Sequence, residues 1–366
     1  MDYRGLVILV IACPCALAIS TPLAMVTAIT AGTKNGIIIK GGEYIEELNK
    51  VKTILFDKTG TLTEGKLEIS EIKSFNNYSN KDIMDIACSL ESKSNHPIAK
   101  AFNDYKKENR LKIKNVSNFE SIPGKGLKAK IENKMYYVGK KDLFNYTKKL
   151  LNVDSLKDNL NKTSVIVGND KEIMGLIGLK DKIWKNSSAT IKGLKNEDIS
   201  TFMITGDNKS TALEVSNNLG LKGFYHDLLP EDKVNKVEEI SNKSSVAMVG
   251  DGVNDSPSLA RTNVGIAMGM NGVDVAIETA DIVLTKDEIS NVSKFIKISK
   301  KAMNIIKQIL VFAIIVKAFL VILGITGHIG LLKAILTGDM GVTLVVLANT
   351  LRIGKTKHQN KGLLIC

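Results

Sequence analysis

The chain has 366 residues and a formal net charge of +12. This length excludes a single small domain, and the basic residues are not interleaved with aromatic ones, which argues against nucleic acid as a partner. Three apolar stretches, about 5–31, 305–326 and 329–353, are each long enough to cross a hydrocarbon layer of roughly 30 Å. We therefore expect a membrane protein whose basic surface meets anionic lipid and nucleotide, with a soluble part between about 50 and 300.

The first apolar stretch contains Cys13–Pro14–Cys15. On a regular helix the two cysteines would point about 200° apart and could not face one ion. Pro14 removes an amide donor and clashes with the carbonyl of Val10, so the helix is expected to unwind here. Unwinding would turn both sulfurs toward a soft metal ion; the alternative is two buried cysteines beside a proline kink. The four cysteines predict no disulfide framework.

Five short apolar runs predict the strands of a mostly parallel sheet with helices between them. They cover 51–56, 200–205, 245–250, 264–268 and 281–284. Asp57, Asp207 and Asp251 stand at or just beyond the ends of the first three runs. Ligands of such sheets bind outside the carboxyl ends of the strands, so these carboxylates are expected to converge. Each alone could cap a helix, but that explains less well why all three have flanking glycines.

Residues 72–170 do not fit this sheet, because they are rich in Lys and Asn and alternate weakly. We interpret them as an inserted α+β domain that separates two parts of the sheet domain, 50–71 and 171–297. The chain has no G-x-x-x-x-G-K-[ST] loop, which excludes a P-loop. The insert contains Glu91, His96 and Gly124–Lys125–Gly126. Taken singly, these residues are better explained as a solvated charge, a surface histidine and a plain turn.

The last two apolar stretches are joined by a few residues around Gly327–His328, so 300–354 predicts a helical hairpin, followed by a basic cytosolic tail at 355–366. At 1.5 Å per residue, Lys317 and Asp339 lie roughly 18 Å and roughly 15 Å into their stretches, near the membrane midplane. A charge there costs at least ~3 kcal/mol on insertion scales and needs a partner or a function. A structural ion pair is one interpretation. We favour Asp339 as a metal ligand with Lys317 as its counter-charge when no ion is bound.

Three motifs occur in an order that resembles the phosphorylation-domain signatures of P-type ATPases: Asp57-Lys-Thr-Gly-Thr61, Thr205-Gly-Asp207 and Gly250-Asp-Gly-Val-Asn-Asp255. Cys13-Pro-Cys15 and Ser94-Asn-His-Pro97 resemble the heavy-metal-transporting branch. The resemblance covers nearly the whole chain. It implies an α/β haloacid-dehalogenase-like (Rossmann-like) phosphorylation domain and an inserted nucleotide-binding domain. It also implies three transmembrane helices, one in 1–35 and two in the hairpin, in a plasma or inner membrane with the catalytic domains in the cytosol.

The resemblance also implies roles around the phosphate. Asp57 would attack the γ-phosphate of ATP and become an aspartyl phosphate. Asp57, the Thr59 carbonyl and Asp251 would bind Mg²⁺, and Lys233 would neutralise charge on the transferred group. The other residues implied there are Thr205, Gly206, Asp207, Asn254 and Asp255. Soluble phosphatases of this fold have an acidic residue where this chain has Thr59. A hydroxyl is no general base near neutral pH, so the phosphoenzyme is expected to persist.

In the insert, the residues implied to hold adenine and ribose are Glu91, His96, Gly124, Gly126 and Gly139. The family often has Asn after the last of these glycines, where this chain has Lys140.

In the membrane, Cys13, Cys15 and Asp339 would offer two thiolates and a carboxylate, which suit Zn²⁺, Cd²⁺ or Pb²⁺, whereas Cu⁺ prefers all-soft ligands. Lys317 and Asp339-Met-Gly341 resemble the zinc/cadmium/lead-exporting subfamily.

Nothing in the sequence resembles the family's actuator domain with its Thr-Gly-Glu loop or its earlier transmembrane helices. We therefore expect a C-terminal portion that binds ATP but does not cycle alone, with a separate N-terminal half as a candidate partner. The alternatives are a membrane-anchored phosphohydrolase and a non-catalytic membrane metal-binding protein. Thr59 and Asp339 disfavour the first, and the intact Asp57, Asp251 and Asp255 disfavour the second.

Overall fold

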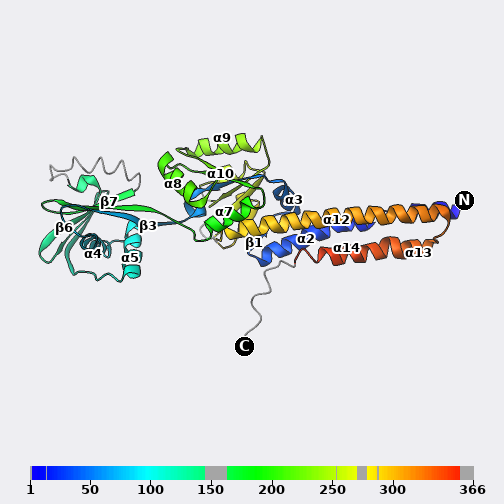
Figure 1. Cartoon of the computed structure of the whole chain (residues 1–366), viewed down its shortest axis with the longest axis horizontal. Coiled ribbons are helices and arrows are strands. Elements are labelled where there is room, and N and C mark those ends of the chain that lie inside the picture. The colour runs from blue at the N-terminus through cyan, green and yellow to red at the C-terminus, as the bar shows by residue number, and fades with distance from the viewer. Residues whose placement is uncertain are drawn as a thin grey trace, which may run out of the picture. The chain divides into compact units, whose positions relative to one another are not determined.

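The computed structural model describes residues 2–13, 15–144, 163–252, 254–269, 278–286 and 288–354. The chain divides into two compact units, whose elements are labelled in Figure 1. The first unit comprises Met1–Thr61, Asn186–Gly206 and Ser216–Cys366, and the second comprises Leu62–Lys185 and Asp207–Val215.

The first unit contains a seven-stranded sheet in the order β1-β13-β12-β11-β2-β9-β10. All neighbours are parallel except β1 and β13. The strands are β1 (Ile37–Ile39), β2 (Thr53–Asp57), β9 (Ser200–Ile204), β10 (Gly223–Tyr225), β11 (Val246–Gly250), β12 (Val264–Met268) and β13 (Ile282–Leu284). The five predicted strands are confirmed to within two residues at each end. The sequence analysis missed β1 and β10, which are three residues long at the two edges.

Burial explains why the central strands are so apolar. Every residue of β11 and β12 is buried, as expected for a parallel sheet covered on both faces. The helices of this unit that follow or precede the strands are α3 (Gly42–Lys50), α7 (Ser187–Lys195), α9 (Pro230–Ser241) and α10 (Ser256–Leu259). Helix α8 (Lys209–Leu219) runs from the second unit into the first. Leu55, Ile204 and Met248 belong to one core cluster, which spans the neighbouring strands β2, β9 and β11.

The second unit is built on a six-stranded antiparallel sheet in the order β3-β8-β7-β6-β5-β4. Its strands are β3 (Thr63–Ser74), β4 (Val116–Ile122), β5 (Gly126–Ile131), β6 (Lys134–Gly139), β7 (Thr163–Asn169) and β8 (Ile173–Ile183), with helices α4 (Asn80–Glu91) and α5 (Pro97–Asn109) and the short helix η2 (Lys141–Phe144). On β5, Leu127, Ala129 and Ile131 alternate inward and join a core with Phe102 of α5. An α+β insert is therefore present.

This unit extends beyond the proposed limits of 72 and 170. Strands β3 and β8 pair with each other from Thr63 opposite Ile183 to Ser74 opposite Gly175. Because this pairing runs past both limits, the compact unit begins at Leu62 and its main segment ends at Lys185.

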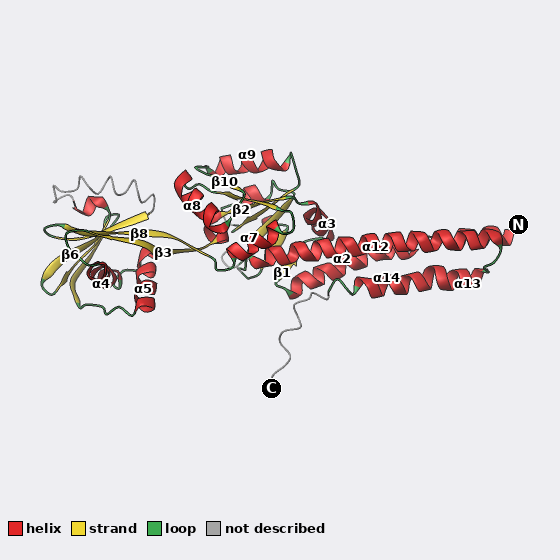
Figure 2. Cartoon of the chain, in the orientation of Figure 1, coloured by secondary structure: helices red, strands yellow, loops and turns green. Residues whose placement is uncertain are grey.

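The apolar stretches form helices in the first unit. The N-terminal stretch is split into α1 (Asp2–Ile11) and α2 (Cys15–Lys34), so the predicted break at the Cys-Pro-Cys motif is present. The hairpin consists of α12 (Ser290–Thr326), α13 (Leu331–Ile335), the π-helical turn η4 (Leu336–Gly341) and α14 (Val342–Thr350) (Figure 2).

Two helical spans of the described residues are long and apolar enough to cross a membrane, Ser290–Thr326 and Leu331–Thr350. The expectation of transmembrane helices is therefore met for the hairpin, and a membrane span in the first stretch stays a prediction. Large apolar side chains of α12 point outward, among them Val311, Ile315 and Phe319. A lipid environment would cover such a surface.

Candidate functional site

Three neighbouring strands deliver the candidate phosphate site. Strand β2 pairs with β11 on one side and with β9 on the other, with Asp57 opposite Ile204. Asp57 ends β2, and the chain then turns at Gly60, which has φ +75°. A side chain at Gly60 would come 3.5 Å from Cβ of Asp251, so the turn after Asp57 packs against Asp251. Two of the three carboxylates that were predicted to converge, Asp57 and Asp251, therefore lie close together.

Lys233 joins two buried carboxylates. Its Nζ lies 2.7 Å from Oδ1 of Asp57 and 3.2 Å from Oδ1 of Asp255. Helix α9 starts with Pro230, whose fixed φ favours the first helical position, and so sets the turn that carries Lys233. The other oxygen of Asp57, Oδ2, accepts a hydrogen bond from the amide of Thr59 at 3.0 Å.

Burial dominates the electrostatics of this group. Desolvation and the charge of Asp255 raise the pKa of Asp57 to about 7, although Lys233 opposes the shift. Desolvation also raises the pKa of Asp255. Burial alone would lower the pKa of Lys233, but Asp57 and Asp255 raise it. The ammonium of Lys233 therefore offsets only part of the pKa increase that burial causes in Asp57 and Asp255.

A cavity of 290 Å³ lies beside this group. Gly206, Lys233, Asn254 and Asp255 line it, as do Leu228 and Pro230, which the sequence analysis did not single out. The amide of Asn254 donates to Oδ1 of Asp251 at 3.3 Å.

Two further predicted residues follow strand β9 along the chain. Thr205 directly follows β9 and is buried, and its amide donates to the carbonyl of Tyr225 at 3.0 Å. Asp207 belongs to the second unit, and its role stays a prediction.

The chemistry of this group fits a hard divalent cation. No cluster of three or more His, Cys, Asp or Glu side chains suited to a metal occurs among the described residues. Mg²⁺ does not need one, since it usually takes one or two carboxylates and completes its shell with water and substrate phosphates. The Gly60 turn that follows Asp57 packs against Asp251. Burial is the main cause of the raised pKa of Asp57, and the negative charges of Asp255 and Asp251 add to it. A cation between them would relieve this repulsion.

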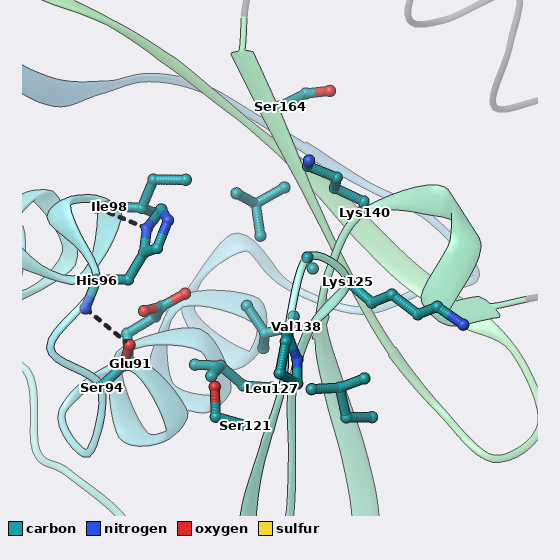
Figure 3. A pocket seen from close by; sticks show the side chains of 16 residues that line it. Glu91, Ser94, His96, Ile98, Ser121, Lys125, Leu127, Val138, Lys140 and Ser164 are labelled. Carbon is teal, nitrogen blue, oxygen red and sulfur yellow. Dashed lines mark hydrogen bonds between the residues drawn. The ribbon is translucent and has the colours of Figure 1, made fainter.

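The second unit contains a pocket of 260 Å³ that brings together all five residues predicted to hold adenine and ribose (Figure 3). These are Glu91, His96, Gly124, Gly126 and Gly139. The sequence analysis did not assign Ser94, Ser121, Lys125, Val138 or Ser164, which also line the pocket. Val138 and Ser164 lie on strands, and only the folded structure shows which face of a strand lines a cavity. Lys140, noted as a departure from the family, lines it too.

Two glycines let strands β5 and β6 approach each other closely at this pocket. Gly126 on β5 stands opposite Gly139 on β6. A Cβ on Gly126 would lie 2.4 Å from the carbonyl oxygen of Val138, and one on Gly139 would lie 2.3 Å from that of Lys125. Gly126 also has φ +147°, which side chains disfavour. No other residue fits at either position without moving the strands.

The polar side chains of the pocket are held in defined states. His96 caps α5, and its Nδ1 accepts a hydrogen bond from the amide of Ile98 at 3.3 Å, so Nε2 carries the proton of the neutral ring. Glu91 is buried, and burial raises the pKa of its carboxyl to about 7. Its Oε2 makes no hydrogen bond to any described residue. A buried oxygen in that state points to a donor supplied by a ligand.

In the membrane hairpin, Lys317 connects three segments. Its Nζ lies 3.5 Å from Oδ1 of Asp339 and donates to the carbonyls of Ile11, at 3.1 Å, and of Cys13. The main-chain carbonyls at the end of α1 thus meet the charges of Lys317 and Asp339. Asp339 lies in η4, and such π-helical turns occur often at functional sites. The ion pair, which was the alternative interpretation, is present and forms part of this larger group.

The cysteines of the motif differ in what the structure describes. The helix break leaves Cys13 outside any helix, where helical geometry no longer restricts the direction of its side chain. Metal binding through Cys13 needs its thiolate form. The side chain of Cys15 lies outside the described part.

Comparisons with known proteins agree with this arrangement. Residues 51–263 match the haloacid dehalogenase-like hydrolases. A cadmium-transporting ATPase of Staphylococcus aureus is 39% identical over 372 residues, which cover 98% of this chain and 50% of that protein.

Two solved structures are also similar, each with 32% sequence identity. A zinc-transporting PIB-type ATPase in the E2.Pi state has a TM-score of 0.86 and is matched over 96% of this chain and 58% of that chain. The catalytic domain of the CPx-ATPase CopB-B has a TM-score of 0.54 and is matched over 72% of this chain and 97% of that domain.

The chain spans about half the length of the curated relatives it matches. Its match to the haloacid dehalogenase-like family covers more than half of its own length, and its match to the CPx-ATPase catalytic domain covers nearly all of that domain. The chain therefore belongs to the haloacid dehalogenase-like family, in the branch of the heavy-metal-transporting P-type ATPases, and corresponds to their C-terminal portion.

Proposed function

We propose that this chain is the motor and ion-site portion of an ATP-driven exporter of divalent heavy-metal cations, Zn²⁺, Cd²⁺ or Pb²⁺. The observation that carries the proposal is one polypeptide holding both the Asp57–Lys233–Asp255 group and the intramembrane group of Lys317 and Asp339. We place its hairpin in a membrane, with the seven-stranded sheet of the first unit and the whole second unit in the cytosol. The remainder of the relatives' length, on this or a separate polypeptide, would complete the cycle.

In the proposed reaction, an oxygen of Asp57 attacks the γ-phosphorus of ATP, the bond between that phosphorus and the β–γ bridging oxygen breaks, and ADP leaves. Lys233, 2.7 Å from Asp57, is placed to neutralise charge on the transferred phosphoryl group. Asp57 must be ionised to attack, and Lys233 favours that form. Mg²⁺ held by Asp57, Asp251 and the Thr59 carbonyl would screen the negative charges of phosphate and carboxylate.

We propose that the pocket of the second unit holds the adenosine part of ATP. Glu91 offers a buried acceptor, which suits the exocyclic amine of adenine. Lys125 and Lys140 line the same pocket and add positive charge for the anionic nucleotide. Gly126 and Gly139 add no side chain to the wall of this pocket, which suits a flat ring.

We propose that the transported ion binds Cys13, Cys15 and Asp339, with the ammonium of Lys317 balancing Asp339 when the ion is absent. The support is the 3.5 Å contact of Lys317 with Asp339 and its bonds to the carbonyls of the broken helix. Two thiolates and one carboxylate favour a borderline-soft divalent ion.

The Asp57→Asn variant tests the phosphorylation step. The purified chain incubated with Mg²⁺ and ATP labelled in the γ-phosphate is expected to form an acid-stable phosphoenzyme, and the variant to form none, because an amide cannot attack in this way. Asp227→Asn is the matched control, since Asp227 is an exposed aspartate of the same unit. Label retained by Asp57→Asn would contradict the assignment.

The Thr59→Asp variant tests why the phosphoenzyme persists. A carboxylate two positions after Asp57 would act as general base for water, so the phosphoenzyme lifetime is expected to fall roughly a hundredfold. Thr59→Asn, which has the same shape but no base, is the control and is expected to keep the wild-type lifetime. The lifetime is measured by chasing the label with unlabelled ATP. Equal lifetimes in the two variants would show that no base is missing at position 59.

The raised pKa of Glu91 predicts a pH-dependent stability of the second unit. Its carboxyl has a pKa of about 7 when folded against 4.5 as the reference value. The folded state therefore binds more protons between these values, and stability falls as the pH rises, by up to roughly 3 kcal/mol. We expect Glu91→Gln to lack this loss.

The measurement is hydrogen exchange of α4 amides at about pH 5 and about pH 8, after correction for intrinsic exchange rates. Glu120→Gln, an exposed residue of the same unit, is expected to keep the wild-type slope. A wild-type slope in Glu91→Gln would refute the assigned pKa.

The Asp339→Asn variant tests the ion site. In the reduced chain in detergent, the variant is expected to bind Zn²⁺ at least about tenfold more weakly by calorimetry, because a neutral amide replaces a charged ligand. Thr337→Ala is the control, since Thr337 lies in the same turn and its hydroxyl bonds only to the carbonyl of Lys333 among the described contacts. Unchanged affinity in Asp339→Asn would remove Asp339 from the site.

A further inference from the structure

A second cavity of the first unit has no role in the functions described above. It measures 410 Å³ and lies where the hairpin's polar ends meet α7, and it shares no lining residue with the phosphate site. The charged residues that line it are Glu197, Lys297, Lys300, Lys301 and Arg352. Lys301 Nζ lies 3.5 Å from the carbonyl of Ile353, so the start of α12 and the end of the hairpin are held side by side.

The wall of this cavity has four cations and one carboxylate, a net charge of +3. Lys300 is occupied by Glu197: its Nζ lies 3.0 Å from Oε2 and donates to the main-chain carbonyl at 2.7 Å. Arg352 donates to the side-chain oxygen of Asn349 at 2.7 Å, a neutral partner. Glu197 is the one acid in the wall, so an anion entering the cavity would meet a surplus of positive charge.

The lining residues of α12 follow a polarity gradient along one helix face. Lys297, Lys301, Asn304, Ile305 and Gln308 recur at spacings of three and four residues, so they share this face. Cations come first, then the amides of Asn304 and Gln308, with Ile305 beside them. From Lys301 to Gln308 the face runs roughly 10 Å toward the apolar part of the helix.

We propose that this cavity binds the phosphate headgroup of an anionic lipid from the cytosolic leaflet. The gradient from cations through amides to apolar side chains matches a lipid's own order of phosphate, glycerol ester and acyl chain. Basic pockets at the cytosolic end of transmembrane helices recognise such headgroups. The proposal rests on the membrane orientation proposed above but not on phosphorylation of Asp57.

The test uses the full chain in detergent with added phosphatidylglycerol or phosphatidylcholine, and counts bound lipid by native mass spectrometry. The wild-type chain is expected to retain phosphatidylglycerol preferentially. Lys301→Gln with Arg352→Gln is expected to weaken this binding at least about tenfold, since each basic residue near the surface contributes substantially to anionic-lipid attraction. Lys294→Gln with Lys307→Gln removes the same charge from α12 outside the cavity and is expected to stay within about twofold of wild type.

Three results would overturn the proposal. The two double variants losing equal affinity would indicate diffuse attraction, and millimolar inorganic phosphate displacing the lipid completely would indicate a site for soluble anions. Full retention of lipid by the Lys301→Gln, Arg352→Gln variant would exclude the cavity as the binding site.

Hydrogen exchange of α12 checks that this variant is folded. If it unfolds, Lys301→Gln alone is compared with Lys307→Gln and is expected to bind the lipid about threefold more weakly than that control. Because the readout is lipid retention, failure here leaves the Asp57 assay unaffected.

Discussion

The contact of one ammonium with two buried carboxylates organises the catalytic half of the chain. Lys233 can reach Asp57 and Asp255 together only because β2 and β11 are neighbours and α9 begins where Pro230 sets it. The strands are apolar throughout, so they deliver their polar ends to a place with little water. Burial is also what raises the pKa values of both acids. The site therefore favours binding of a cation together with a phosphate group, because the two ligands neutralise each other's charge.

Compensation of charge and of polar main-chain groups also organises the hairpin. Lys317 pairs with the carboxylate of Asp339 and donates hydrogen bonds to two main-chain carbonyls at the end of the broken helix. Unpaired groups of this kind are costly in a bilayer. The helix break at the Cys-Pro-Cys motif and the two intramembrane charges are thus parts of one arrangement, and neither would be stable in lipid without the other.

The sequence was sufficient to predict the central strands and the convergence of Asp57 with Asp251, because buried parallel strands are continuous apolar runs and their carboxyl ends must meet. It also predicted the five pocket residues of the second unit, through the family resemblance. It did not predict the extent of that unit, since the long β3–β8 pairing depends on partners a hundred residues apart. Nor did it predict Val138 or Ser164 in the pocket, because which face of a strand lines a hollow depends on packing between strands.

The π-helical turn at Leu336–Gly341 has an evolutionary consequence. A turn of this kind holds one residue more than the α-helical turn it replaces. Deleting one residue within it would restore regular α-helical turns, because the π-helical turn absorbs its extra residue locally. Helix α14 would then keep its orientation, whereas residues inside the turn, Asp339 among them, would shift around the helix axis. A change in length here would therefore act first on the contact of Asp339 with Lys317.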